Sequence, residues 1–232
     1  MLNRLFAYVL AAALAMAPAI ANAQAANPAP STYAYGPAGQ PIAPLYGGLI
    51  GSYAKSLSTG TMAAALAAGS PIYSFRYTGT GFAVIKRVTF SAGNAGTGFA
   101  AGVANFSLFA ARAFTASDSG GTAATLTGNN GKLRTSFPTT SVGDIRISST
   151  ATLTAGTRTL DTDALAGMEV GVPTTANAQL AAPGALLLDP KNAGDYPLVL
   201  ATNEGFVIQA TVPATGTWSG DVFVEWDEYS AY

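Results

Sequence analysis

Residues 204–228 read EGFVIQATVPATGTWSGDVFVEWDE, and this stretch decides the fold. Its first part, residues 206–212, is rich in β-branched and aromatic side chains, which favour strands. Residues 213–216 carry proline and glycine and predict a turn. In residues 217–228, one parity carries Trp218, Val222, Val224 and Trp226, and the other carries Asp221, Phe223, Glu225 and Asp227. Because successive side chains of a strand point to opposite faces, the pattern predicts a strand that buries both tryptophans.

Similar runs occur through most of the chain. Strands are predicted at residues 72–77, 82–90, 105–114, 144–148, 151–160, 186–188 and 198–200. Glycine and proline turns separate most of them, and residues 115–140 form a long polar loop. Many short strands with such turns are typical of a sandwich or barrel. We therefore expect an all-β fold, a single antiparallel β-sandwich of the jelly-roll kind, with an extended N-terminal arm.

The N-terminal segment, residues 1–23, resembles a secretory signal peptide. Arg4 supplies the positive charge, residues 5–17 are apolar, and Ala21-Asn22-Ala23 matches the small-x-small cleavage pattern. Cleavage would leave Gln24 as the new N-terminus. If the segment were instead retained, it would be an anchoring helix, and only then would the protein meet a membrane.

Residues 24–69 are rich in proline, alanine and glycine and are expected to form an extended arm or a linker. Tyrosines spaced along an arm can dock into a partner's grooves, so we expect subunit contacts at Tyr33, Tyr35, Tyr46 and Tyr53. Residues 61–68 are alanine-rich and suit a short helix. The predicted organisation is a signal-like segment at 1–23, an arm at 24–69 and a β-sandwich domain at 70–232.

Composition narrows the possible functions. The chain has 232 residues, no cysteine and no histidine, which removes disulfides, thiolate metal sites and the commonest general base. Charged residues make up 10% of the chain and the net charge is −1, so no basic surface for nucleic acid is indicated. A surface so poor in charge favours burial against other subunits, although a plain compositional bias explains it equally well.

Acidic residues form two candidate sites. Asp161 and Asp163 are two positions apart, which suits paired carboxylates or Ca²⁺, but a solvated face or turn is the favoured interpretation. Glu225, Asp227 and Glu228 suit a cation site or a glycoside-cleaving site. The favoured interpretation is a charged outer face on the last strand, protecting a sheet edge.

Two other features have ordinary structural interpretations. Residues 128–132, GNNGK, resemble a phosphate loop only superficially and predict a turn. Trp218 and Trp226 could stack on sugars, but their parity with Val222 and Val224 favours the core. We therefore predict no catalytic, cofactor-binding or metal-binding residue, and no enzymatic activity.

Two stretches resemble a group of uncharacterised structural proteins of tailed phages and prophages. The first runs through residues 109–122, 128–134 and 144–148, and the second through residues 195–200, 204–208 and 224–226. The likeness covers residues 70–232. It implies a place in the virion, with other virion proteins and copies of the same chain as partners, and it supplies no catalytic motif.

Two functional hypotheses follow. The first is a non-enzymatic virion protein, either a capsid decoration or a tail or fibre component, which assembles through its arm and uncharged surface. The second is a secreted or periplasmic β-sandwich that binds surfaces or cell-surface glycans, which the signal-like segment favours. A glycosidase that uses carboxylates alone is a distant third.

Overall fold

The structure, a computed structural model, describes residues 33–35, 41–44, 48–175, 177–189 and 197–231. The chain divides into two compact units, Met1–Leu45 and Tyr46–Tyr232. In the first unit, β1 (Tyr33–Tyr35) and β2 (Pro41–Pro44) form an antiparallel pair. The second unit is built from strands, and within the described ranges no helix has the length and apolarity needed to cross a membrane.

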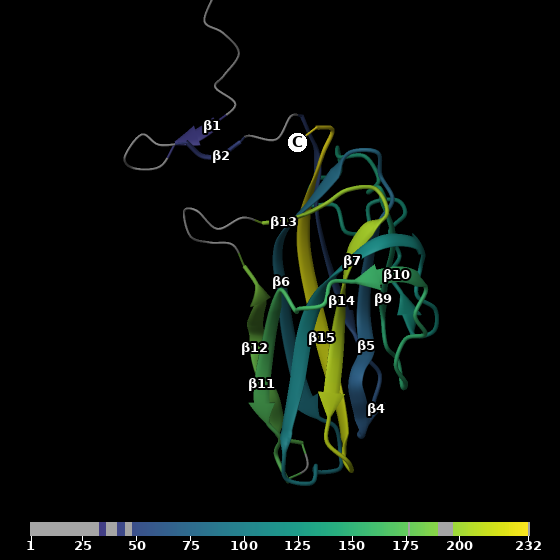
Figure 1. Ribbon diagram of the computed structural model, residues 1–232, viewed down its shortest axis with the longest axis vertical. Helices are drawn as coiled ribbons and strands as arrows, with labels where there is room; N and C mark the ends of the chain where they lie inside the picture. Colours follow the sequence, from purple (N-terminus) through teal and green to yellow (C-terminus); the bar gives the residue numbers. More distant parts are fainter. Residues whose placement is uncertain (1–32, 36–40, 45–47, 176, 190–196, 232) are drawn as a thin grey trace, which may run out of the picture. The chain divides into compact units, whose positions relative to one another are not determined.

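Two antiparallel sheets pack face to face in the second unit (Figure 1). The larger sheet has the order β10-β7-β14-β5-β9-β8, with β11 also paired to β7. The smaller sheet has the order β12-β6-β15-β3, with β13 paired to β6 and β4 paired to β15. The larger sheet comprises β5 (Leu66–Tyr77), β7 (Val103–Ala116), β8 (Thr122–Ala123), β9 (Val142–Ile147), β10 (Thr157–Leu160), β11 (Ala166–Gly171) and β14 (Glu204–Val212). The smaller sheet comprises β3 (Leu49–Ser58), β4 (Met62–Ala63), β6 (Phe82–Asn94), β12 (Gln179–Leu188), β13 (Leu198–Leu200) and β15 (Thr217–Tyr229).

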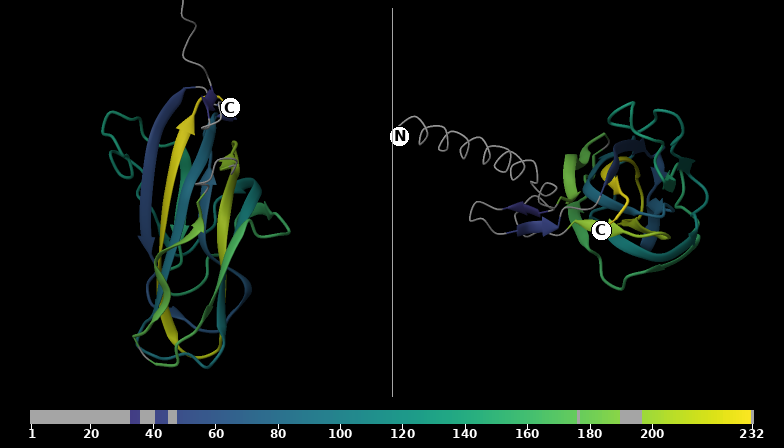
Figure 2. Two further views of the ribbon diagram at one scale, coloured as in Figure 1. Left: turned by 90° about the vertical axis from the view of Figure 1, so that its left-hand side faces the viewer. Right: turned by 90° about the horizontal axis from the view of Figure 1, so that it is seen from above.

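The strand order is that of a jelly roll. Its eight positions in chain order are β3, β5, β6, β7, β11, β12 with β13, β14 and β15. The smaller sheet holds the first, eighth, third and sixth positions, and the larger sheet holds the second, seventh, fourth and fifth. Successive positions thus alternate between the two sheets, except for the fourth and fifth, which are neighbours in the larger sheet. The view from above in Figure 2 shows the strands surrounding the core. The predicted β-sandwich of the jelly-roll kind is confirmed.

Aromatic side chains join the two sheets. Phe75 of β5 stacks on Phe206 of β14, with ring centroids 5.1 Å apart, and meets the edge of Trp226 at 5.3 Å. Toward the other end of β15, Trp218 lies 5.7 Å from Phe106 of β7. Trp218 and Trp226 are both fully buried. The prediction that both tryptophans belong to the core is confirmed, and neither is exposed to stack on a sugar.

The loop between β8 and β9 covers the outer edge of β3. The backbone N–H of Ala54 donates to the carbonyl of Gly131 at 2.8 Å, and that of Leu133 donates to the carbonyl of Ser52 at 3.0 Å. The ammonium of Lys55 donates to the carbonyl of Thr125 at 3.1 Å. The long polar loop expected at residues 115–140 therefore occupies hydrogen-bonding groups that an edge strand otherwise leaves open.

The predicted domain boundary at residue 70 is wrong. β3 lies within the arm expected at residues 24–69, yet it pairs with β15 from Leu49 to Ser58. Tyr53, expected to contact another subunit, is fully buried and stacks on Trp226 with centroids 5.5 Å apart. Its hydroxyl donates to the carbonyl of Pro138 at 3.1 Å. Because its ring completes the core of its own domain, Tyr53 is not available to a partner.

The helix expected at residues 61–68 is also absent, because this segment forms β4 and the start of β5. Met62 is fully buried and pairs with Trp218, and Ala65 turns the chain with φ of 59°. Packing of Met62 against the sheet outweighs the helix propensity of the alanines. Of the other expected arm tyrosines, Tyr33 and Tyr35 lie in β1, whereas Tyr46 and the signal-like segment lie outside the described residues.

Candidate functional site

A β-bulge in β6 creates the candidate site. Glu225 of β15 pairs with Arg87, but the pairing slips before Trp226, so that Lys86 is an extra residue. A bulge of this kind re-aims the side chains around it. Here it lets two consecutive cations reach the sheet face that carries Glu225 and Asp227, as their ion pairs show.

The strand beside β6 is interrupted at the same place. β12 ends at Leu188, opposite Val88, and β13 begins at Leu198, opposite Ile85. A surface pocket of about 440 Å³ lies beside the bulge. We call it the bulge pocket, and it is lined by Val84, Lys86, Arg87, Asp189, Pro197, Glu225, Asp227 and Tyr229.

Ion pairs link the charged side chains of the bulge pocket. The ammonium of Lys86 lies 3.5 Å from Glu225 Oε1 and 3.4 Å from Asp227 Oδ2. Arg87 Nη2 lies 3.2 Å from Glu225 Oε2. Tyr229 donates its hydroxyl to Asp227 Oδ2 at 3.4 Å. The carboxylates of Glu225 and Asp227 are thus each neutralised by at least one cation. This arrangement suits the binding of a ligand better than general acid–base catalysis.

Two polar atoms of β6 and β15 at the bulge pocket have no hydrogen-bond partner among the described residues. They are Arg87 Nε, a donor, and Asp227 Oδ1, an acceptor, and both are buried. A buried polar group left unpaired costs about 1–3 kcal/mol, so a hydrogen bond from a further partner would stabilise each of these two atoms.

No group of three or more potential metal ligands is found among the described residues.

The acidic group of the last strand is divided between two environments. Glu225 and Asp227 share the outer face, as their parity predicted, and Trp226 faces the core. The expectation that they protect a sheet edge is wrong, because β15 lies between β6 and β3.

Glu228, expected on the outer face, is fully buried. Its carboxylate accepts hydrogen bonds from the hydroxyl of Thr140, from the backbone N–H of Ser141 at 3.0 Å and from Trp226 Nε1 at 3.2 Å. Burial, with a smaller contribution from the charge of Glu228, raises the pKa of Tyr53 to about 12 and that of Tyr77 to about 12. Glu228 therefore links β15 to the loop that covers β3.

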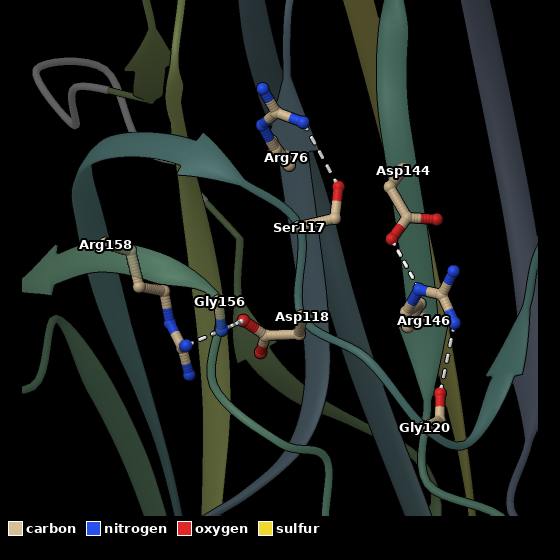
Figure 3. Close-up of polar contacts among 8 residues, drawn as sticks. All are labelled: Arg76, Ser117, Asp118, Gly120, Asp144, Arg146, Gly156 and Arg158. Carbon is tan, nitrogen blue, oxygen red and sulfur yellow. Dashed lines mark hydrogen bonds and ion pairs between the residues drawn. The ribbon is translucent and has the colours of Figure 1, made fainter.

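A second polar cluster, on the outer face of the larger sheet, is structural (Figure 3). Arg158 of β10 lies 2.6 Å from Asp118, and both side chains are almost completely buried. The backbone N–H of Gly156 also donates to Asp118 at 2.9 Å, and the guanidinium of Arg158 lies over the ring of Phe114. These contacts hold the chain that follows β7 against β10.

Arg76 and Arg146 extend this cluster across the sheet (Figure 3). Arg76 donates to the hydroxyl of Ser117 at 3.2 Å, and Arg146 donates to Asp144 at 2.6 Å and to the carbonyl of Gly120 at 3.1 Å. Three arginines therefore fix one crossing segment in place.

Burial dominates the electrostatics of the Asp118–Arg158 pair. Desolvation raises the pKa of Asp118 above its ordinary value, against the opposing effects of the Gly156 N–H and of Arg158. It likewise lowers the pKa of Arg158, against the attraction of Asp118. Both shifts show that the two charges are costly to bury and depend on each other.

We expect Asp118→Ala to lower the free energy of unfolding by about 3 kcal/mol, because it leaves the Arg158 charge buried without its partner. The double variant Asp118→Leu with Arg158→Met should recover most of this loss, since neither charge then remains in the protein interior. Urea denaturation of the three proteins measures the difference. An equal loss in the single and double variants would contradict the role given to the pair.

The remaining sequence candidates lie apart from the bulge pocket. Asp161 and Asp163 follow β10 in a bend, as the favoured interpretation predicted, and Asp161 pairs with Arg112 at 3.3 Å. Hydrogen bonds to Asp161 and Glu204 raise the pKa of Arg112. Residues 128–131 form a turn, as predicted.

Sequence reasoning missed most of the bulge pocket. It found Glu225 and Asp227, but not Lys86, Arg87 or Tyr229. The sequence does contain one indication of these residues, the adjacent pair Lys86-Arg87 in the middle of an apolar strand. Because neighbouring side chains of a regular strand point to opposite faces, one of the two charges would enter the core unless a bulge intervened.

Comparison with known proteins gives no match to this chain, whether with family models, curated proteins or solved structures.

Proposed function

We propose that this protein is a non-enzymatic structural component of a phage virion, either a capsid decoration or a tail or fibre subunit. The observation that carries the proposal is the complete eight-position jelly roll, an architecture used by viral capsid domains and lectins. Fold alone does not define function. The proposal therefore also draws on the resemblance of residues 70–232 to structural proteins of tailed phages and prophages.

The proposed assembly element is the segment that precedes β3, residues 24–47, which replaces the longer arm expected from the sequence. The described part of the sandwich begins at Gly48, whose carbonyl accepts a hydrogen bond from the backbone N–H of Ser230 at 3.1 Å. Tyr33, Tyr35 and Tyr46 remain the proposed contacts with other subunits. A non-enzymatic role is supported by the missing histidine and by the cations that neutralise Glu225 and Asp227.

The test is the location of the natural protein. Particles induced from the strain that carries the gene should contain it after density-gradient purification, at a copy number that quantitative mass spectrometry can relate to the major capsid protein. A protein found only outside particles, with Gln24 as its N-terminus, would support the secreted alternative and overturn the virion proposal.

The alternative function, a secreted β-sandwich that binds surfaces or glycans, is favoured by two observations. One is the signal-like pattern of residues 1–23, and the other is the bulge pocket, which offers charged and hydroxyl groups on an outer face.

A further inference from the structure

We propose that the bulge pocket is a binding site for a neutral saccharide. The inference goes beyond the virion proposal and does not depend on it, because such a site would serve equally on a particle or on a secreted protein.

The charge of the bulge pocket selects against the other common ligands. Its lining carries three carboxylates, Asp189, Glu225 and Asp227, and two cations, Lys86 and Arg87. A phosphate or sulfate would lie beside three negative groups, and a bound amine would compete with both cations for the same carboxylates. A neutral ligand avoids both costs.

The hydrogen-bonding groups of the bulge pocket match a hydroxyl group. A hydroxyl both donates and accepts hydrogen bonds. The pocket has an unpaired acceptor at Asp227 Oδ1 and an unpaired donor at Arg87 Nε, on neighbouring strands. Lys86 contributes an ammonium that can donate a third hydrogen bond after its two ion pairs. A sugar ring with adjacent hydroxyls can satisfy all three groups.

Binding requires a small adjustment of the side chains around these atoms. Arg87 Nε and Asp227 Oδ1 are covered, but the Arg87 side chain is 41% exposed and can rotate away from Glu225. Tyr229 and Pro197 add partly apolar walls, against which the C–H groups of a sugar ring can pack. The volume of about 440 Å³ lies within the range of small-molecule sites.

Saturation-transfer difference NMR on the purified full chain tests the proposal. The probes are glucose, galactose, mannose and N-acetylglucosamine at millimolar concentration, with inorganic phosphate as a competitor. At least one sugar should bind, and phosphate should not displace it. Lys86→Ala and Asp227→Asn should each weaken that binding about tenfold or more, because each removes a charged hydrogen-bonding partner.

The matched control is Arg112→Ala. Arg112 is as exposed as Lys86, at 44% against 45%, and like Lys86 it pairs with two carboxylates, here Asp161 and Glu204 on the larger sheet. It should leave sugar binding unchanged. Lys86 is exposed, so its variant should keep the native melting temperature and remain informative even if Asp227→Asn unfolds. Failure of all four sugars to bind, displacement by phosphate, or undiminished binding by Lys86→Ala would overturn the saccharide site, whatever the location of the protein in or outside particles.

Discussion

A chain that begins at Ser70 is expected not to form the sandwich, whereas a chain that begins at Gly48 is expected to fold. The shorter chain lacks β3 and β4, which pair with β15 on the side away from β6. It therefore loses the buried side chains of Tyr53 and Met62 and opens one side of a core strand to water. Each large buried side chain contributes several kcal/mol, against a total stability of about 5–15 kcal/mol for a domain.

Circular dichroism and thermal melting distinguish the two chains. The chain from Gly48 is the control, because it keeps every described strand of the second unit and removes only what precedes it. It should show a β-type spectrum and a cooperative melt, and the chain from Ser70 should show neither. A cooperative melt of the shorter chain at an unchanged temperature would mean that β3 is an accessory strand.

Trp226→Ala is expected to lower the free energy of unfolding by about 3–5 kcal/mol. The indole contacts Tyr53 and Phe75, so its removal leaves a cavity between the sheets. The substitution also removes the hydrogen bond that Trp226 Nε1 donates to the carboxylate of Glu228, which is fully buried. Trp218→Ala should have a similar cost, because Trp218 is equally buried and its Nε1 donates to the carbonyl of Ala63 at 3.2 Å. Chemical denaturation measures both losses.

Phe223→Ala is the matched control, since it removes an aromatic side chain from the opposite face of the same strand. Phe223 is partly exposed and contacts the guanidinium of Arg87. Its truncation should cost about 1 kcal/mol or less. A loss for Trp226→Ala no larger than that for Phe223→Ala would show that the sandwich closes without the tryptophan.

Strong alternation made much of the fold predictable. β7, β14 and β15 carry regular apolar faces, and their pairing into a sandwich follows from that pattern and from the turns between them. β3 was missed because its sequence, LIGSYAKSLS, has few large apolar residues. Such a segment becomes a strand because β15 offers it a full set of backbone partners, and strand preference depends on that context.

The candidate site was predictable only in part. Parity along one strand placed Glu225 and Asp227 together, and this needs no knowledge of neighbouring strands. Lys86 and Arg87 join them through a slip in register, and Asp189 directly follows a strand that ends beside the slip. Register slips and strand ends depend on pairing across the sheet, which alternation within one strand does not encode.

The loop that covers β3 also determines how copies of this protein can associate. With the backbone groups of Ser52 and Ala54 engaged by residues 131 and 133, a neighbouring chain cannot continue the smaller sheet at that side. Strand-by-strand polymerisation of the sheet is therefore blocked at that edge. Contacts between copies at that edge must then be made by side chains or by a separate segment, so that specific residues determine their number and geometry.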